Sequence, residues 1–147
     1  MLVRLMPDQV DKVWDVLAPM IAESLPPTEV YSGSGMVGIL RSLLVEDMIC
    51  WLYYGDDEET EKDPYTLVLT TEQLNKHTDS KNLLIYALYG IQEMPRAWWL
   101  DGFKTLKKYA EGTNCKKITA YSNIPSIIKF WEKLGGSNEF RFLTMEV

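Results

Sequence analysis

Residues 82–110 read NLLIYALYGIQEMPRAWWLDGFKTLKKYA, and this stretch decides the fold class. Residues 82–91 form an apolar run with the length and composition of a strand. The segment GFKTLKKYAEG, which starts at Gly102, then places Phe103, Leu106 and Ala110 on one side of a helix that we expect Gly112 to cap. KKITAYS (116–122) reads as another strand. A strand, a helix and a strand in succession form a right-handed crossover between parallel strands, so the stretch predicts an α/β fold.

The flanking sequence extends this unit on both sides. We expect a short edge strand over 1–5, a helix over 8–25 with a kink at Pro19, and a second helix from Ser34 to the residues before Glu46. MICWLYY (48–54) and YTLVLTT (65–71) predict strands on either side of an acidic loop, GDDEETEKD (55–63), as in a hairpin. A helix over 123–136 and an alternating strand over 139–147 follow. The predicted order is β-α-α-β-β-β-α-β-α-β, with a mixed sheet, in one domain spanning residues 1–147.

Composition excludes several classes of protein. No window approaches the roughly 18 consecutive apolar residues of a membrane span, and the amino terminus lacks the features of a secretory signal. We therefore expect a cytoplasmic protein. The net charge of −6 argues against nucleic-acid binding, which needs a basic surface.

The potential metal ligands are few. His77 is the single histidine and lies in a polar stretch, which removes most zinc motifs. Cys50 and Cys115 are isolated, and isolated cysteines in a cytoplasmic protein are usually free thiols. We expect no metal site, and we expect His77 to lie in an exposed loop.

The tail NIPSIIKFWEKLGG, from Asn123 to Gly136, together with the element order, resembles the GCN5-related N-acetyltransferases. The phrases NLLIYALYG and YSNIP also look like those of small acetyltransferase-like proteins of tailed bacteriophages. The first resemblance implies a GCN5-related N-acetyltransferase-like mixed sheet. The second implies a viral protein.

The family resemblance implies a site for the diphosphate of acetyl-CoA at the start of the helix after residues 82–91. In the family, a (Q/R)-x-x-G-x-(G/A) loop brings backbone amides to the phosphates at a helix N-terminus. The family spacing places that loop at Met94, Ala97 and Trp99, none of which is a glycine. Arg96 is the only residue of this loop that could bind a phosphate by charge, and Pro95 lacks an N–H donor. We expect a degenerate cofactor motif.

The remaining family positions are altered or ambiguous. The tyrosine that protonates the leaving thiolate in many members corresponds to Trp131 here. Asn123 matches the family and is a candidate cofactor contact, although asparagine before a helix is also an ordinary N-cap. Glu93 is either a base acting through water or a favourable charge at a helix start. We assign Arg96 and Asn123 as candidate cofactor contacts and no residue as catalytic.

Trp98 and Trp99 are adjacent where the family has its glycine loop. One indole would fill the notch between strands that CoA occupies in active relatives. Alternatively, the pair would anchor a protein partner or cover a different ligand. Adjacent helical residues point about 100° apart, so we expect at least one indole to be partly exposed.

These patterns favour a protein that retains the scaffold, uses no cofactor and acts through contacts with a viral or host protein, in the host cytoplasm or the virion. The alternative is a divergent acyl-CoA-dependent N-acyltransferase acting on an amine. It would hold acetyl-CoA through Arg96, loop amides and Asn123, with water or a strand tyrosine as the acid. The sequence leaves the substrate and the oligomeric state open.

Overall fold

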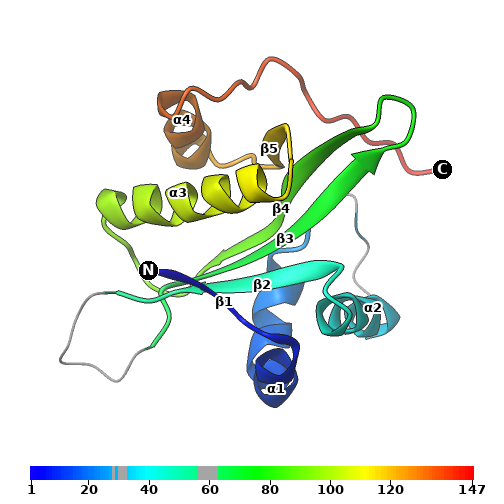
Figure 1. Ribbon diagram of the computed structural model, residues 1–147, viewed down its shortest axis with the longest axis vertical. Helices are drawn as coiled ribbons and strands as arrows, with labels where there is room; N and C mark the ends of the chain where they lie inside the picture. Colours follow the sequence, from blue (N-terminus) through cyan, green and yellow to red (C-terminus); the bar gives the residue numbers. More distant parts are fainter. Residues whose placement is uncertain (28, 30–32, 56–62) are drawn as a thin grey trace.

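The computed structural model describes residues 1–27, 29, 33–55 and 63–147 (Figure 1). Most of the acidic loop, residues 56–62, lies outside the described residues. The elements are β1 (Leu2–Arg4), α1 (Pro7–Glu23), α2 (Gly33–Leu44), β2 (Met48–Tyr53), β3 (Thr66–Asn75), β4 (Ser80–Gly90), α3 (Arg96–Gly112), β5 (Lys117–Ala120) and α4 (Pro125–Lys133).

The strands form one sheet in the order β1-β2-β3-β4-β5. Neighbours from β1 to β4 are antiparallel, whereas β4 and β5 are parallel and joined through α3. The predicted α/β class and mixed sheet are therefore confirmed, and the element order matches the prediction through α4. Residues 139–147 differ from it, because this segment runs as an extended chain outside the sheet.

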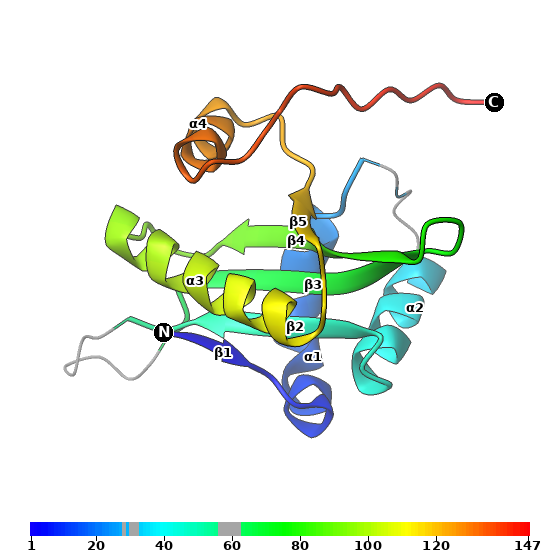
Figure 2. The ribbon, with the colours of Figure 1, turned by 45° about the horizontal axis from the view of Figure 1, so that its top comes forward.

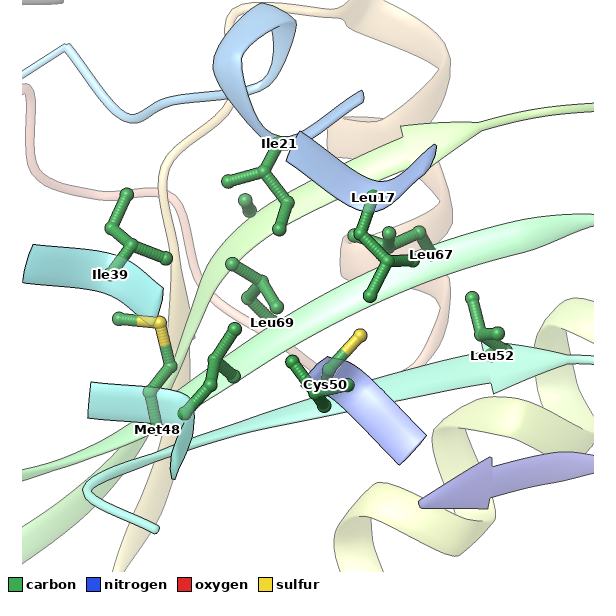
Figure 3. Packing of buried hydrophobic residues seen from close by; sticks show 11 residues of the cluster. Leu17, Ile21, Ile39, Met48, Cys50, Leu52, Leu67 and Leu69 are labelled. Atoms are coloured by element: carbon green, nitrogen blue, oxygen red, sulfur yellow. The ribbon is translucent and has the colours of Figure 1, made fainter. Parts of the chain in front are cut away.

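Helices cover both faces of the sheet. Helices α1 and α2 pack on one face and α3 on the other (Figures 1 and 2). Leu17 and Ile21 of α1 point toward Leu67 and Leu69 of β3 in the core beneath α1 and α2 (Figure 3). A second cluster beneath α3 includes Leu106. Successive residues of β2 and β3 point to opposite faces of the sheet, so both strands supply buried apolar side chains to the cluster on each face.

Helix α3 begins earlier than the sequence indicated. Its first residue is Arg96, with Pro95 at the N-cap, so Trp98 lies in its first turn and not in a preceding loop. Proline is compatible with this position because its missing N–H is not needed there. At the other end the predicted cap at Gly112 is wrong. Thr113 is the C-cap, and Asn114 takes the left-handed conformation, with φ of 61°.

Helix α4 also begins differently from the prediction. Its N-cap is Ile124, and no side chain caps the helix, so Asn123 is not the N-cap. At its end, Gly135 has φ of +87°, a conformation that favours glycine, as expected for a helix stop.

Candidate active site

Strand β4 has a neighbour on its β5 side along only part of its length. The parallel pairing runs from Asn82 with Lys117 to Ile85 with Ala120. From Tyr86 to Gly90, β4 continues with no strand on that side among the described residues. We call residues 86–90 the open edge of β4.

A β-bulge lies where this open edge begins. On the β3 side, Leu69 pairs with Ala87 and Thr70 pairs with Ile85, so Tyr86 is an extra residue without a partner in the register. A bulge bends its strand and increases the local twist. The position of Tyr86, directly after the last β4–β5 pair, therefore accounts for the divergence of the two strands.

Two tyrosine–glutamate pairs join the open edge to the end of α1 and the segment after it. The Glu29 carboxylate accepts a hydrogen bond from Tyr86, and the Glu23 carboxylate, at the end of α1, accepts one from Tyr89. Burial, and then the charge and hydrogen bond of Glu29, raise the pKa of Tyr86 to about 12. The charge and hydrogen bond of Glu23 also raise the pKa of Tyr89. Both phenols stay protonated at neutral pH.

The two tyrosine–glutamate pairs can bind an amine and accept its proton. Glu23 and Glu29 are exposed carboxylates held in place by phenol donors. A carboxylate in such a position attracts a cationic amine and can accept a proton from it through water. Because its pKa is high, Tyr86 is a hydrogen-bond donor and a poor proton source.

The N-terminus of α3 can bind an anion. Pro95 provides no side-chain cap, and its carbonyl oxygen accepts the N–H groups of Trp98 and Trp99 at 3.0 and 3.4 Å. The N–H groups of Arg96 and Ala97 have no acceptor among the described residues. A phosphate is suited to this position for three reasons. Two free amides can donate to it, the helix end is positive, and the exposed Arg96 side chain adds a charge. The predicted role of Arg96 stays compatible with this geometry.

Trp98 does not fill the notch beside β5. Its ring packs against Tyr53 of β2 and Tyr65 at the start of β3, with centroids 5.9 and 5.1 Å away. Both partners lie on the β2–β3 side of the sheet, so Trp98 is a structural aromatic between α3 and these strands. Trp99 is half-buried, as is Trp98, in agreement with the expected partial exposure.

The other predicted site residues lie apart from one another. Asn123 is exposed in the connection between β5 and α4, and Glu93 is exposed in the connection between β4 and α3. Among the described residues, the side chains of Asn123, Glu93 and Arg96 make no hydrogen bond or ion pair. Trp131 packs edge-on against Phe103 of α3, with centroids 5.8 Å apart, so it links α4 to α3.

Sequence reasoning missed Glu23 and Glu29. Tyr86 and Tyr89 belong to the predicted strand over 82–91, and the only role considered for a strand tyrosine was that of the acid. The contacts between these tyrosines and glutamates depend on how α1 packs against β4, and no local sequence pattern predicts that packing. The available signal was the buried stripe of α1, which directs the end of that helix toward the sheet.

A polar cavity of about 720 Å³ lies elsewhere in the fold. Glu46, Glu72, Lys81 and Tyr109 are among its lining residues, and none of the lining residues belongs to the open edge of β4 or to the first turn of α3. Its charges are partly paired, since Lys81 lies 3.3 Å from Glu72. We therefore place the candidate active site at the open edge and not in this cavity.

The fold matches solved acetyltransferases along the whole chain. An aminoglycoside acetyltransferase from an uncultured soil metagenomic sample has 16% sequence identity and a TM-score of 0.69, with 100% of this chain and 97% of that chain covered. AAC(6′)-Iy, in complex with the bisubstrate analogue CoA-S-monomethyl-acetylneamine, has 8% identity and a TM-score of 0.68 over the same shares of the two chains. The ribosomal-protein-alanine N-acetyltransferase of Brucella melitensis biovar Abortus 2308 has 11% identity and a TM-score of 0.66, with 100% and 99% covered.

Sequence comparisons give no match. No protein-family model matches this chain, and no curated protein matches it. The likeness therefore establishes the fold, and the phage resemblance finds no support. Within the described residues, no helix is both long and apolar enough to span a membrane.

One prediction needs correction. The expectation that the protein uses no cofactor is contradicted, because the structural neighbours are acetyltransferases and one of them was solved with a CoA bisubstrate analogue. The absence of glycine at Met94, Ala97 and Trp99 led to that expectation. The missing glycines do not exclude a cofactor, because free amides at a helix N-terminus bind phosphate without a glycine where the side chains point away.

Proposed function

We propose that this protein is an acyl-CoA-dependent N-acyltransferase that acts on an amine. The observation that carries the proposal is the divergence of β4 from β5 at the Tyr86 bulge, within a fold matched to acetyltransferases over the whole chain. The open edge of β4 offers unpaired backbone groups to an acyl chain. The Tyr86–Glu29 pair lies at the same point of the strand.

The cofactor would be held at the start of α3. The Arg96 guanidinium and the free amides of Arg96 and Ala97 are suited to the diphosphate of acetyl-CoA. Asn123, exposed after β5, is a further candidate contact. When bound, acetyl-CoA supplies the acyl group as a reactive thioester.

The acceptor amine would bind from the α1 side of the sheet. Glu29, oriented by Tyr86, attracts the ammonium form, and Glu23, oriented by Tyr89, adds a second negative charge nearby. Only the neutral amine is a nucleophile. We assign to Glu29 the acceptance of its proton through water, as the C–N bond forms and the C–S bond breaks. The leaving thiolate takes a proton from solvent, because the raised pKa of Tyr86 makes this phenol a weak acid.

The non-catalytic hypothesis is less well supported. It depended on the altered family motif and predicted a viral or host protein partner, whereas the structural likeness favours the enzymatic alternative. The viral origin, the location in a host cytoplasm or virion, and the protein partner stay predictions.

Calorimetric titration with acetyl-CoA and with CoA tests the proposal. We expect stoichiometric binding of both, together with release of free thiol from acetyl-CoA when a panel of primary amines is added. An N-acylated amine identified by mass spectrometry would establish the reaction. Absence of binding at millimolar acetyl-CoA would restore the non-catalytic hypothesis. Binding without transfer to any amine would leave a cofactor-binding protein and overturn the proposed reaction.

A further inference from the structure

The segment after α4 has the properties of a strand without a sheet. We call residues 137–147 the tail. It is extended, and residues 140–147 make no backbone hydrogen bond to any described residue. In both views the tail runs away from α4 and ends beyond the body of the sheet (Figures 1 and 2).

The tail also exposes apolar side chains on two sides. Successive residues of an extended chain point to opposite sides, so Phe140 and Phe142 share one side, and Leu143, Met145 and Val147 share the other. Phe140 is 90% exposed, Leu143 87% and Met145 89%. A strand with apolar residues on both sides is typical of a position covered on both faces of a sheet. Such exposure in water is unfavourable.

Strand β5 is an uncovered edge of the same sheet. It pairs with β4 on one side, and on its other side no described residue forms a backbone hydrogen bond with it. An edge of this kind is a template for another strand. Two exposed lysines lie at its start, Lys117 as its first residue and Lys116 just before it, whereas the tail carries two carboxylates, Glu139 and Glu146, and one cation, Arg141.

The tail and this edge do not pair within one chain. The tail touches its own chain beside β5 at Phe142, whose ring lies 4.9 Å from that of Tyr121, the residue after the end of β5. It therefore passes the end of the strand and does not run along it. Two complementary elements that remain unpaired in one copy can pair between two copies about a two-fold axis.

We propose that the tail adds as a strand to the free edge of β5 in a second copy of this chain, reciprocally, to give a two-fold dimer. Each five-stranded sheet then gains one further strand, which comes from the other copy. Each dimer contact buries the apolar sides of one tail and satisfies the free backbone groups of one β5 edge. The proposal does not depend on the proposed reaction.

Light scattering of the full chain across a concentration series tests it. We expect a mass of twice 17.0 kDa at high protein concentration and dissociation on dilution. The double variant Phe140→Asp/Leu143→Asp places a charge on each side of the tail and should be monomeric. Because both residues are exposed in the single copy, its secondary structure by circular dichroism should not change. The control is Val16→Asp, at a valine of α1 that is 60% exposed, which should leave the dimer intact.

Hydrogen exchange locates the contact. Amides of residues 140–147 and of β5 should be protected at concentrations that favour the dimer and lose protection on dilution. A wild-type chain that stays monomeric would overturn the proposal. So would a double variant that still dimerises, or a dimer whose tail amides exchange freely.

Discussion

Trp98 packs edge-on against Tyr65, with ring centroids 5.1 Å apart and an interplanar angle of 84°. The same indole lies over Gly55, where an added Cβ would come within 2.7 Å of the ring. The first turn of α3 is thus tied to the ends of β2 and β3 by one aromatic side chain, and Gly55 leaves the space that it occupies. This turn also carries the two free amides of the candidate phosphate site.

Gly55→Ala should therefore displace the Trp98 indole. We expect a loss of about 1–3 kcal/mol in the free energy of unfolding, typical of an enlarged side chain at a close contact. We also expect weaker binding of CoA, because the first turn of α3 shifts with the indole. Urea denaturation followed by tryptophan fluorescence measures the first effect, and calorimetry the second.

The matched control is Gly112→Ala. No atom outside the local backbone lies within 4 Å of a Cβ at Gly112, and alanine is the better helix former there. We expect unchanged or slightly raised stability, by up to about 1 kcal/mol. Equal effects of the two substitutions would show that Trp98 does not depend on the space at Gly55.

The sequence predicted the elements better than their contacts. Local periodicity and turn residues determine where strands and helices lie, and the order through α4 followed from them. The contact of Trp98 with Tyr65 and the hydrogen bond between Tyr86 and Glu29 depend on how distant segments pack. The final strand was predicted from its alternating residues, but pairing requires a neighbouring strand, and the tail pairs with none among the described residues.

Arg96→Ala should weaken CoA binding by about tenfold. A charge-assisted hydrogen bond contributes about 1.5–3 kcal/mol, and the exposure of Arg96 places the effect at the low end. The control is Lys108→Ala, which removes an exposed cation from the same helix, far from its N-terminus. Calorimetry at two salt concentrations should show that the affinity for CoA depends less on salt in Arg96→Ala than in the wild type. Identical affinities for both variants would exclude Arg96 from the phosphate site.

Glu29→Gln should slow acyl transfer and lower the pKa of Tyr86. Burial is the main cause of the raised pKa, so the value should fall from about 12 only part of the way toward the ordinary 10.0. Absorbance of tyrosinate during alkaline titration measures this shift, and thiol release measures the rate. Glu111→Gln, at an exposed position near the end of α3, is the control. A slower reaction without a change in the Tyr86 titration would argue against the Tyr86–Glu29 pair.

Cys50 should make the fold sensitive to alkali. Burial raises the pKa of its thiol from 9.0 to about 12. The folded state therefore holds the proton more tightly than the unfolded state does, and this contribution to stability is complete below pH 9.0 and is lost progressively as the pH rises toward about 12. Urea midpoints measured between pH 8 and pH 11 should fall, and less steeply for Cys50→Ala. An equal slope for this variant would assign the alkaline loss to other groups.

The hydrogen bond beneath α3 provides the last test. The Trp51 Nε1–H group donates to the Thr70 hydroxyl at 2.9 Å, and the two residues are 5% and 1% exposed. Thr70→Val keeps the shape and leaves the indole N–H without an acceptor, which should cost about 1–3 kcal/mol in the free energy of unfolding. Thr71→Val is the control, because that hydroxyl donates to the Asp47 carbonyl oxygen at an exposed position. A cost at Thr71 as large as that at Thr70 would mean that the penalty arises from the β-sheet surface and not from the buried indole.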